Sequence, residues 1–158
     1  MKKFHFSLQK LKDFREQELD RQKNALSMLQ ADLRRIEEAR EVLIDKVSEQ
    51  SEQLDRVYRL GSTASDIAMR KRYIVTLQQE IHIKEQQAIE KQAEIEKQLD
   101  VVVEATKDVK TLEKLEEKQL EEYNHAAAKE NEQFIEEFVS GQTVRASNPA
   151  SETAGAAE

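Results

Sequence analysis

The sequence predicts an all-α protein, an antiparallel two-helix coiled-coil hairpin with a longer second helix and a disordered C-terminal tail. The first observation is a row of apolar residues at a strict spacing of seven, which keeps one side of a helix facing a partner as a left-handed supercoil forms. The second is the composition, 38% hydrophobic and 36% charged with no Trp, which is typical of long helices rather than of a globular core. The third is Gly61, which separates two long stretches that are free of Gly and Pro. The row consists of Ile67, Ile74, Ile81, Ala88, Ile95, Val102 and Val109.

The first helix is expected over residues 7–60, after a short extended lead-in. Ser7 is expected to cap its N-terminus, because a serine hydroxyl can accept a bond from a free backbone N–H there. From Leu19 onwards, two rows with a spacing of seven define the side that faces the second helix, and nine of their twelve residues are apolar. The rows are Leu19, Leu26, Leu33, Arg40, Val47, Leu54 and Gln22, Leu29, Ile36, Leu43, Gln50, Val57.

A short turn over residues 61–65 is expected to connect the two helices. Gly61 can adopt the left-handed conformation that ends a helix without a steric cost. Thr63 or Ser65 can cap the second helix, and Asp66 in its first turn interacts favourably with the helix dipole. So short a connection makes the helices antiparallel neighbours within one chain.

The predicted register places residues of the two helices opposite one another. Leu26 is expected to face Val102, and Arg40, the one charged member of its row, is expected to lie across the small Ala88. The aliphatic stem of an arginine can cover a small residue such as Ala88, while its guanidinium reaches the edge of the interface between the two helices, which we call the seam.

The second helix is expected over residues 66–140, followed by a tail over 141–158 whose Gly, Ser, Thr and Ala bury too little to fold. Its second inward row is polar in places: Leu77 and Leu99 are apolar, whereas Lys84, Glu85, Lys91 and Gln92 crowd the other positions. The N-terminal end of the first helix is expected to lie opposite a point near residue 118 of the second helix. Apolar side chains beyond it are therefore expected to be partly unpaired and to form a docking surface. They are Leu120, Tyr123, Ala126, Ala127, Phe134, Ile135, Phe138 and Val139.

The sequence shows no signature of a catalytic, cofactor or metal site. It has no Gly-rich phosphate loop, no nucleophile elbow and no zinc-binding spacing of His or Cys. Glu121 and His125 are four residues apart and His82 lies near Glu85, but two ligands do not make a metal site and such pairs are common on helix surfaces. We therefore expect no enzyme, no cofactor and no metal.

The predicted location is the cytoplasm. The absence of Cys suits a reducing compartment. Lys10, Lys12 and Asp13 interrupt the N-terminus before the apolar core of a signal peptide could form. No stretch approaches the roughly 18 apolar residues that a membrane span needs.

The two ends of the predicted hairpin differ in charge. The open end, over residues 111–137, is rich in Glu. The tip is basic, and the basic residues in the first turns of the second helix gain no stability from the helix dipole. A partner is therefore expected for the tip. Nucleic acid is not the expected partner, since the chain as a whole carries a charge of -7. The basic tip patch consists of Arg56, Arg59, Arg70, Lys71 and Arg72.

Several short motifs resemble the FliJ family, the soluble coiled-coil component of the bacterial flagellar type III export apparatus. The similarity covers about residues 1–140 and includes the length and the two-helix layout. Lys12 departs from it, because many relatives have an apolar residue there. The motifs are Phe4-x-Phe6-x-Leu8 with Leu11, Phe14, Arg15 and Glu18, then Leu11-Lys12-Asp13, Leu43-Ile44-Asp45, Tyr73-Ile74 and Thr76-Leu77.

The resemblance implies a central stalk in the ring of the hexameric export ATPase, linked to the cytoplasmic domain of the export gate and to export chaperones. It also implies peripheral association with the inner membrane through this apparatus. The gate contact would include Leu43, Tyr73 and Leu77, whereas Ala39, Lys46, Gln50, Glu80 and Lys84 depart from the family pattern. The ring-contacting end would consist of Phe4, Phe6, Leu8, Leu11, Phe14, Arg15, Leu120, Tyr123, Phe134 and Phe138.

Two alternatives belong to other functional classes. The chain could be a homodimeric scaffold in which long helices pair between two molecules, or a holdase-type chaperone that grips clients between its helices. A monomer by light scattering favours the hairpin, and an obligate dimer at every concentration favours the scaffold.

Overall fold

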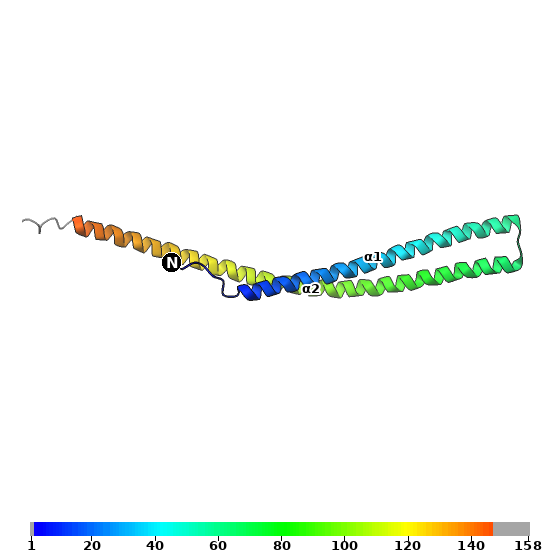
Figure 1. Cartoon of the computed structure of the whole chain (residues 1–158), viewed down its shortest axis with the longest axis horizontal. Helices are drawn as coiled ribbons and strands as arrows, with labels where there is room; N and C mark the ends of the chain where they lie inside the picture. Colours follow the sequence, from blue (N-terminus) through cyan, green and yellow to red (C-terminus); the bar gives the residue numbers. More distant parts are fainter. Residues whose placement is uncertain (1, 147–158) are drawn as a thin grey trace, which may run out of the picture. The chain divides into compact units, whose positions relative to one another are not determined.

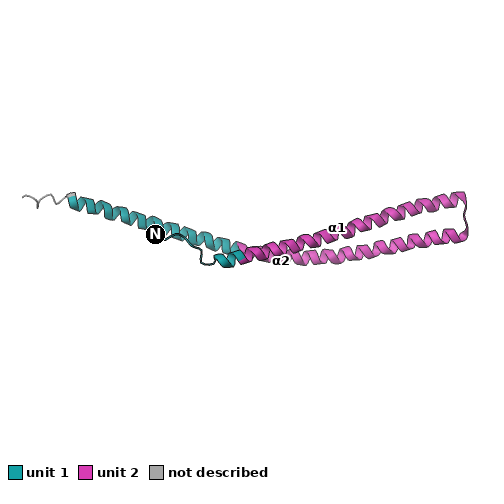
Figure 2. Ribbon diagram, viewed as in Figure 1, with its two compact units in different colours: residues 1–13, 110–158 teal, residues 14–109 magenta. Residues whose placement is uncertain are grey.

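The computed structural model describes residues 2–146, and within them the chain forms two helices and no strand (Figure 1). Helix α1 spans Gln9–Leu60 and the longer helix α2 spans Ala64–Ala146. The predicted all-α class with a longer second helix is confirmed. The chain divides into two compact units (Figure 2). We call residues 14–109 the hairpin unit, and residues 1–13 with 110–158 the terminal unit.

The turn between the helices is shorter than predicted. Gly61 has a φ of 79°, and its N–H donates to the carbonyl of Val57 at 3.0 Å, so it ends α1 in the expected left-handed conformation. Helix α2 then begins at Ala64 rather than at residue 66. Of the two predicted caps, Thr63 is the one used, because its Oγ1 accepts the backbone N–H of Asp66 at 3.2 Å.

Both outer helix boundaries also differ from the prediction. Helix α1 begins at Gln9, two residues after Ser7, where the Gln9 N–H donates to the carbonyl of Phe6 at 3.2 Å. Helix α2 continues past the predicted end at residue 140 to Ala146, so residues 141–146 of the predicted tail are helical. A single Gly141 costs a helix only about 1 kcal/mol, which does not end it. The rest of that tail, residues 147–158, lies outside the described residues.

The two helices of the hairpin unit pack along the predicted rows. Every member of both α1 rows is buried or half-buried, and Leu77, Ile95 and Val109 are buried on α2. The two helices run antiparallel: Gln22 on α1 accepts a hydrogen bond from Gln98 at 2.7 Å, whereas Arg40, further along α1, lies 3.4 Å from Glu85, which comes earlier on α2. The particular pairing of Leu26 with Val102 stays a prediction.

Two residues of the second inward row predicted for α2, Gln92 and Leu99, are exposed instead. Leu99 is 42% exposed, and the neighbouring Gln98 faces α1 instead. The seven-residue spacing from Leu77 through Lys84 and Lys91 leads to residue 98, and the amide of Gln22 satisfies the polar side chain there.

Arg40 on α1 forms an ion pair with Glu85 on α2, with 3.4 Å between Arg40 Nε and Glu85 Oε1. Its Nε is buried without a hydrogen bond, which makes this the least well satisfied polar position of the seam among the described residues.

Candidate interaction surfaces

The lead-in before α1 packs onto α2 within the terminal unit. The ring of Phe4 lies 5.5 Å from that of Tyr123 with a tilt of 55°, and the Tyr123 hydroxyl donates to the carbonyl of Lys2 at 2.7 Å. Such an aromatic pair contributes about 0.5–1.5 kcal/mol beyond its buried area. Phe6 is only 3% exposed. Three predicted ring-contact residues, Phe4, Phe6 and Tyr123, therefore take part in packing inside this unit.

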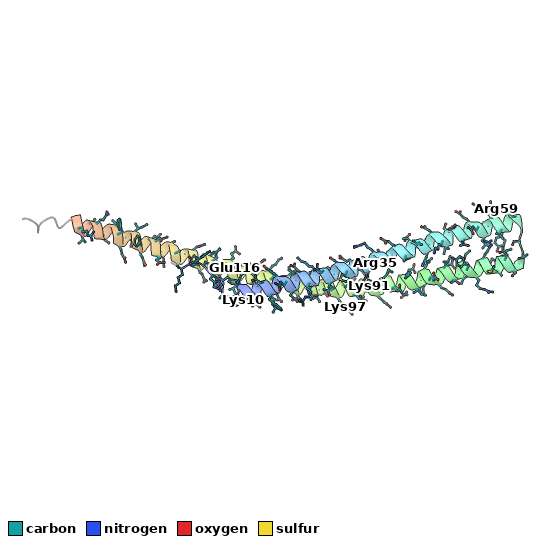
Figure 3. The ribbon with its side chains drawn as sticks, viewed as in Figure 1. Lys10, Arg35, Arg59, Lys91, Lys97 and Glu116 are labelled. Carbon is teal, nitrogen blue, oxygen red and sulfur yellow. The ribbon has the colours of Figure 1, made fainter. Side chains whose placement is uncertain are left out.

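Lys12 connects the first turns of α1 to α2. Its Nζ lies 2.7 Å from Glu116 Oε2, and both side chains are largely shielded from water. Figure 3 labels Glu116 on α2. A shielded ion pair of this kind is sensitive to the loss of one partner, because the other is left with an uncompensated charge. Leu8 is half-buried and Leu11 is exposed, so Lys12 rather than Leu11 faces inward. Sequence reasoning missed this pair, although the departure of Lys12 from the apolar pattern was its signal.

The distal part of α2 is exposed on all sides. From residue 128 to residue 145 every described side chain is exposed. Phe134, Ile135, Phe138 and Val139 lie on one face, because members of the set are three or four residues apart (134 and 138, 135 and 138, 135 and 139), which makes them neighbours on a helix. The predicted contact residue Leu120 is exposed as well. Acidic side chains surround this distal apolar face, which consists of residues 134, 135, 138 and 139; they are Glu130, Glu132, Glu136 and Glu137.

Two other predicted ring contacts belong to the hairpin unit. Phe14 is exposed. Arg15 has its Nη1 3.5 Å from Asp108 Oδ2 across the two helices. Because both groups of this pair are about half exposed, its contribution to stability is small.

The predicted gate contact has one exposed member. Leu77 is 3% exposed and lies in the seam, Leu43 is half-buried in the α1 row, and Tyr73 is exposed. A protein partner can reach Tyr73 without disturbing the hairpin, whereas contact with Leu77 would need the helices to separate.

The basic tip patch is partly neutralised by its own surroundings. Arg70 Nε lies 3.2 Å from Asp66 Oδ2, to which the Ser62 hydroxyl also donates at 2.8 Å. The hydrogen bond from Ser62 and then that from Arg70 lower the pKa of Asp66 below its usual value. The ammonium of Lys71 lies 5.5 Å from the centre of the Tyr58 ring. Arg70 and Lys71 therefore have contacts within the hairpin, which the dipole argument alone did not foresee.

Arg56 and Arg59 complete the α1 side of the tip patch. They line a shallow hollow together with the acidic Glu52 and Asp55 (Figure 3 labels Arg59). This arrangement lowers the net positive charge that the tip presents.

The described residues hold no group of three or more His, Cys, Asp or Glu that could bind a metal ion. His82 Nδ1 lies 3.8 Å from Glu85 Oε2 on the helix surface. Along residues 2–146, neither helix has an apolar stretch long enough to cross a membrane.

Two long helices with no strand among the described residues define an all-α protein of the coiled-coil class. The chain belongs to the FliJ family: the family model described as "Flagellar FliJ protein" matches residues 4–148. It is thus a component of the flagellar export apparatus. Neither a curated protein nor a solved structure matches the chain.

Proposed function

We propose that the chain is a non-enzymatic central stalk in the ring of the hexameric export ATPase, located in the cytoplasm and held at the inner membrane through the export apparatus. The observation that supports this most directly is the distal apolar face of α2. Exposed Phe134 and Phe138 on a fully accessible helix, ringed by carboxylates, suit insertion into an opening with an apolar wall and basic rim.

The role that we propose for Phe4, Phe6 and Tyr123 is indirect. Because they pack on one another or are buried, they shape the end of the terminal unit rather than offering free side chains to the ring. Leu11 and Leu120 are exposed apolar residues of the same unit. Phe14, Arg15 and Leu8 stay predicted contacts.

Links to the export gate and to export chaperones are the second part of the proposal. Tyr73 is the accessible gate contact, and Leu43 and Leu77 support the helix that presents it. The hydrogen bond between Gln22 and Gln98 supports a hairpin within one chain over a scaffold whose helices pair between chains.

The test is stimulation of the purified export ATPase by the full chain. Replacing both Phe134 and Phe138 with Ser is expected to abolish stimulation and co-purification with the ring, because the apolar contact is lost. Val139→Ser is expected to weaken both the stimulation of the ATPase and the co-purification with the ring. Its matched control is Val42→Ser, at a residue of α1 with the same exposed fraction of 54%. Circular dichroism checks that every variant remains helical.

Undiminished stimulation by the Phe134→Ser, Phe138→Ser variant would count against the stalk. An equal loss with Val42→Ser would mean that surface apolarity in general, rather than the distal face, determines binding.

A further inference from the structure

The residues that point outward on α2 between positions 75 and 89 carry no carboxylate, ammonium or guanidinium group, in a protein that is 36% charged. At the edge of this set, the Glu85 carboxylate lies 3.8 Å from His82 Nδ1. On the opposite side of the helix, Leu77, Ile81 and Ala88 face α1 and are buried or half-buried. All of the outward residues are exposed, including three β-branched apolar ones. We call this set the uncharged α2 face; it consists of Val75, Thr76, Gln79, His82, Ile83, Gln86 and Ile89.

This face contains a shallow hollow with an apolar lining. Val75 and Ile83 line it together with Gln79 and His82. Exposed apolar side chains grouped in this way usually mark an interaction surface. The predicted gate contact Tyr73 and the seam residue Leu77 are not part of it, so the uncharged α2 face is separate from the surface discussed above.

The order of residues on the face is nearly the same in both directions. Gln79 lies three residues before the central His82, and Gln86 lies three residues after the central Ile83. Further out on each side comes a β-branched apolar residue, Val75 or Ile89. A twofold contact between identical chains needs such a self-complementary surface. In an antiparallel contact, Gln79 would face Gln86 of the other copy, and glutamine amides can both donate to and accept from one another.

The two ends of the face have opposite charges. Arg72 precedes it and Glu90 follows it, and neither forms an ion pair within the part of the chain that the structure describes. In an antiparallel contact each Arg72 lies near Glu90 of the other copy, so that charge complementarity occurs at both ends. An acidic or a basic partner would satisfy only one of these charges.

We propose that the uncharged α2 face binds a second copy of this chain in an antiparallel twofold contact centred at His82 and Ile83. Each chain keeps its own hairpin, so this dimer differs from a scaffold made by exchanging helices. The distal apolar face of α2 takes no part in it.

Sedimentation velocity of the full chain over micromolar to millimolar concentrations tests the proposal. The expected result is a concentration-dependent change from monomer to dimer. Ile83→Glu is expected to weaken the dimer by roughly tenfold or more, because it places two like charges at the centre of the contact. The matched control Val42→Glu introduces the same charge at a residue with the same 54% exposure and should leave the dimer unchanged.

Charge exchange and cross-linking test the geometry. Arg72→Glu should weaken the dimer, and adding Glu90→Arg should restore it. Because the chain has no Cys, His82→Cys should form a disulfide between chains on oxidation, whereas Met28→Cys, on an exposed part of α1, should not. A natural chain that stays monomeric at the highest concentration would overturn the proposal. So would a dimer that Ile83→Glu leaves intact or that Val42→Glu weakens equally, while circular dichroism shows that both variants are folded.

Discussion

Gln98 on α2 donates a hydrogen bond to Gln22 on α1 at 2.7 Å, and the same amide also donates to the Gln22 backbone carbonyl at 3.0 Å. Gln22 in turn donates to Glu18 at 2.7 Å, so the pair belongs to a small polar network within the hairpin unit. Polar residues at such positions lower the stability of a coiled coil but specify its register.

This network predicts a cross-link within one chain. With Gln22→Cys and Gln98→Cys in a chain that has no other Cys, a short bifunctional thiol reagent is expected to join the two helices of a single molecule. The product should migrate as a monomer in denaturing gels and contain one internal cross-link by mass spectrometry. Pairing Gln22→Cys with Leu99→Cys is the control, because residue 99 is exposed and should react far less. Predominant cross-linking between two chains would contradict the intramolecular hairpin.

Phe6 is expected to stabilise the terminal unit. Phe6→Ser should lower the free energy of unfolding by about 3 kcal/mol, because it removes a buried aromatic side chain and leaves a cavity. Hydrogen exchange should then become faster at residues 2–8. Phe14→Ser, on an exposed side chain, is the control and should change stability by less than about 0.5 kcal/mol. Equal effects of the two substitutions would show that the lead-in does not depend on Phe6.

The two described glycines should respond to alanine in opposite directions. Gly61→Ala is expected to destabilise the hairpin by about 1–2 kcal/mol, because a φ of 79° is unfavourable for a residue with a Cβ even though nothing lies within 4 Å of it. Gly141 lies within a helix and has open space around it. Gly141→Ala should therefore stabilise the helix locally by up to about 1 kcal/mol. Thermal melts followed by circular dichroism measure both; a stabilised Gly61→Ala variant would exclude the left-handed turn.

Asp66 should contribute to stability in a pH-dependent way. Its pKa is lowered in the folded chain by Ser62 and then Arg70, so the folded state favours the carboxylate. The contribution is present above the pKa of the unfolded chain and is lost as the pH falls through the lower pKa of the folded chain. Asp66→Asn should therefore reduce the melting temperature at neutral pH but not in strong acid. Asp45→Asn, at an exposed position of α1, serves as the control. A difference that persists unchanged in strong acid would show that charge at Asp66 is not the cause.

The helix-facing rows could be predicted from the sequence because they depend only on the geometry of an α-helix. A spacing of seven returns to the same side of a supercoiled helix whatever its partner is, which is why Leu19, Leu77 and Ile95 are buried as expected. The inward position predicted for Leu99 was wrong, because the seven-residue spacing from Leu77 leads to residue 98, where the amide of Gln22 pairs with Gln98.

The candidate surfaces were predictable in part. Exposure of Phe134 and Phe138 followed from the greater length of the second helix. The burial of Phe6 did not follow, because residues 2–8 are outside both helices and have no periodicity that fixes their direction. The same reason applies to the Phe4 and Tyr123 rings, which are separated by more than half of the chain and meet only after it folds back.

The sequence alone determined the two helices, the turn at Gly61 and the side of each helix that faces the other, since periodicity and backbone preference are local properties. Only the tertiary structure decided that Lys12 pairs with Glu116 and that Phe6 is buried. These contacts depend on the distance between residues far apart in the chain, and a local pattern contains no information about that distance.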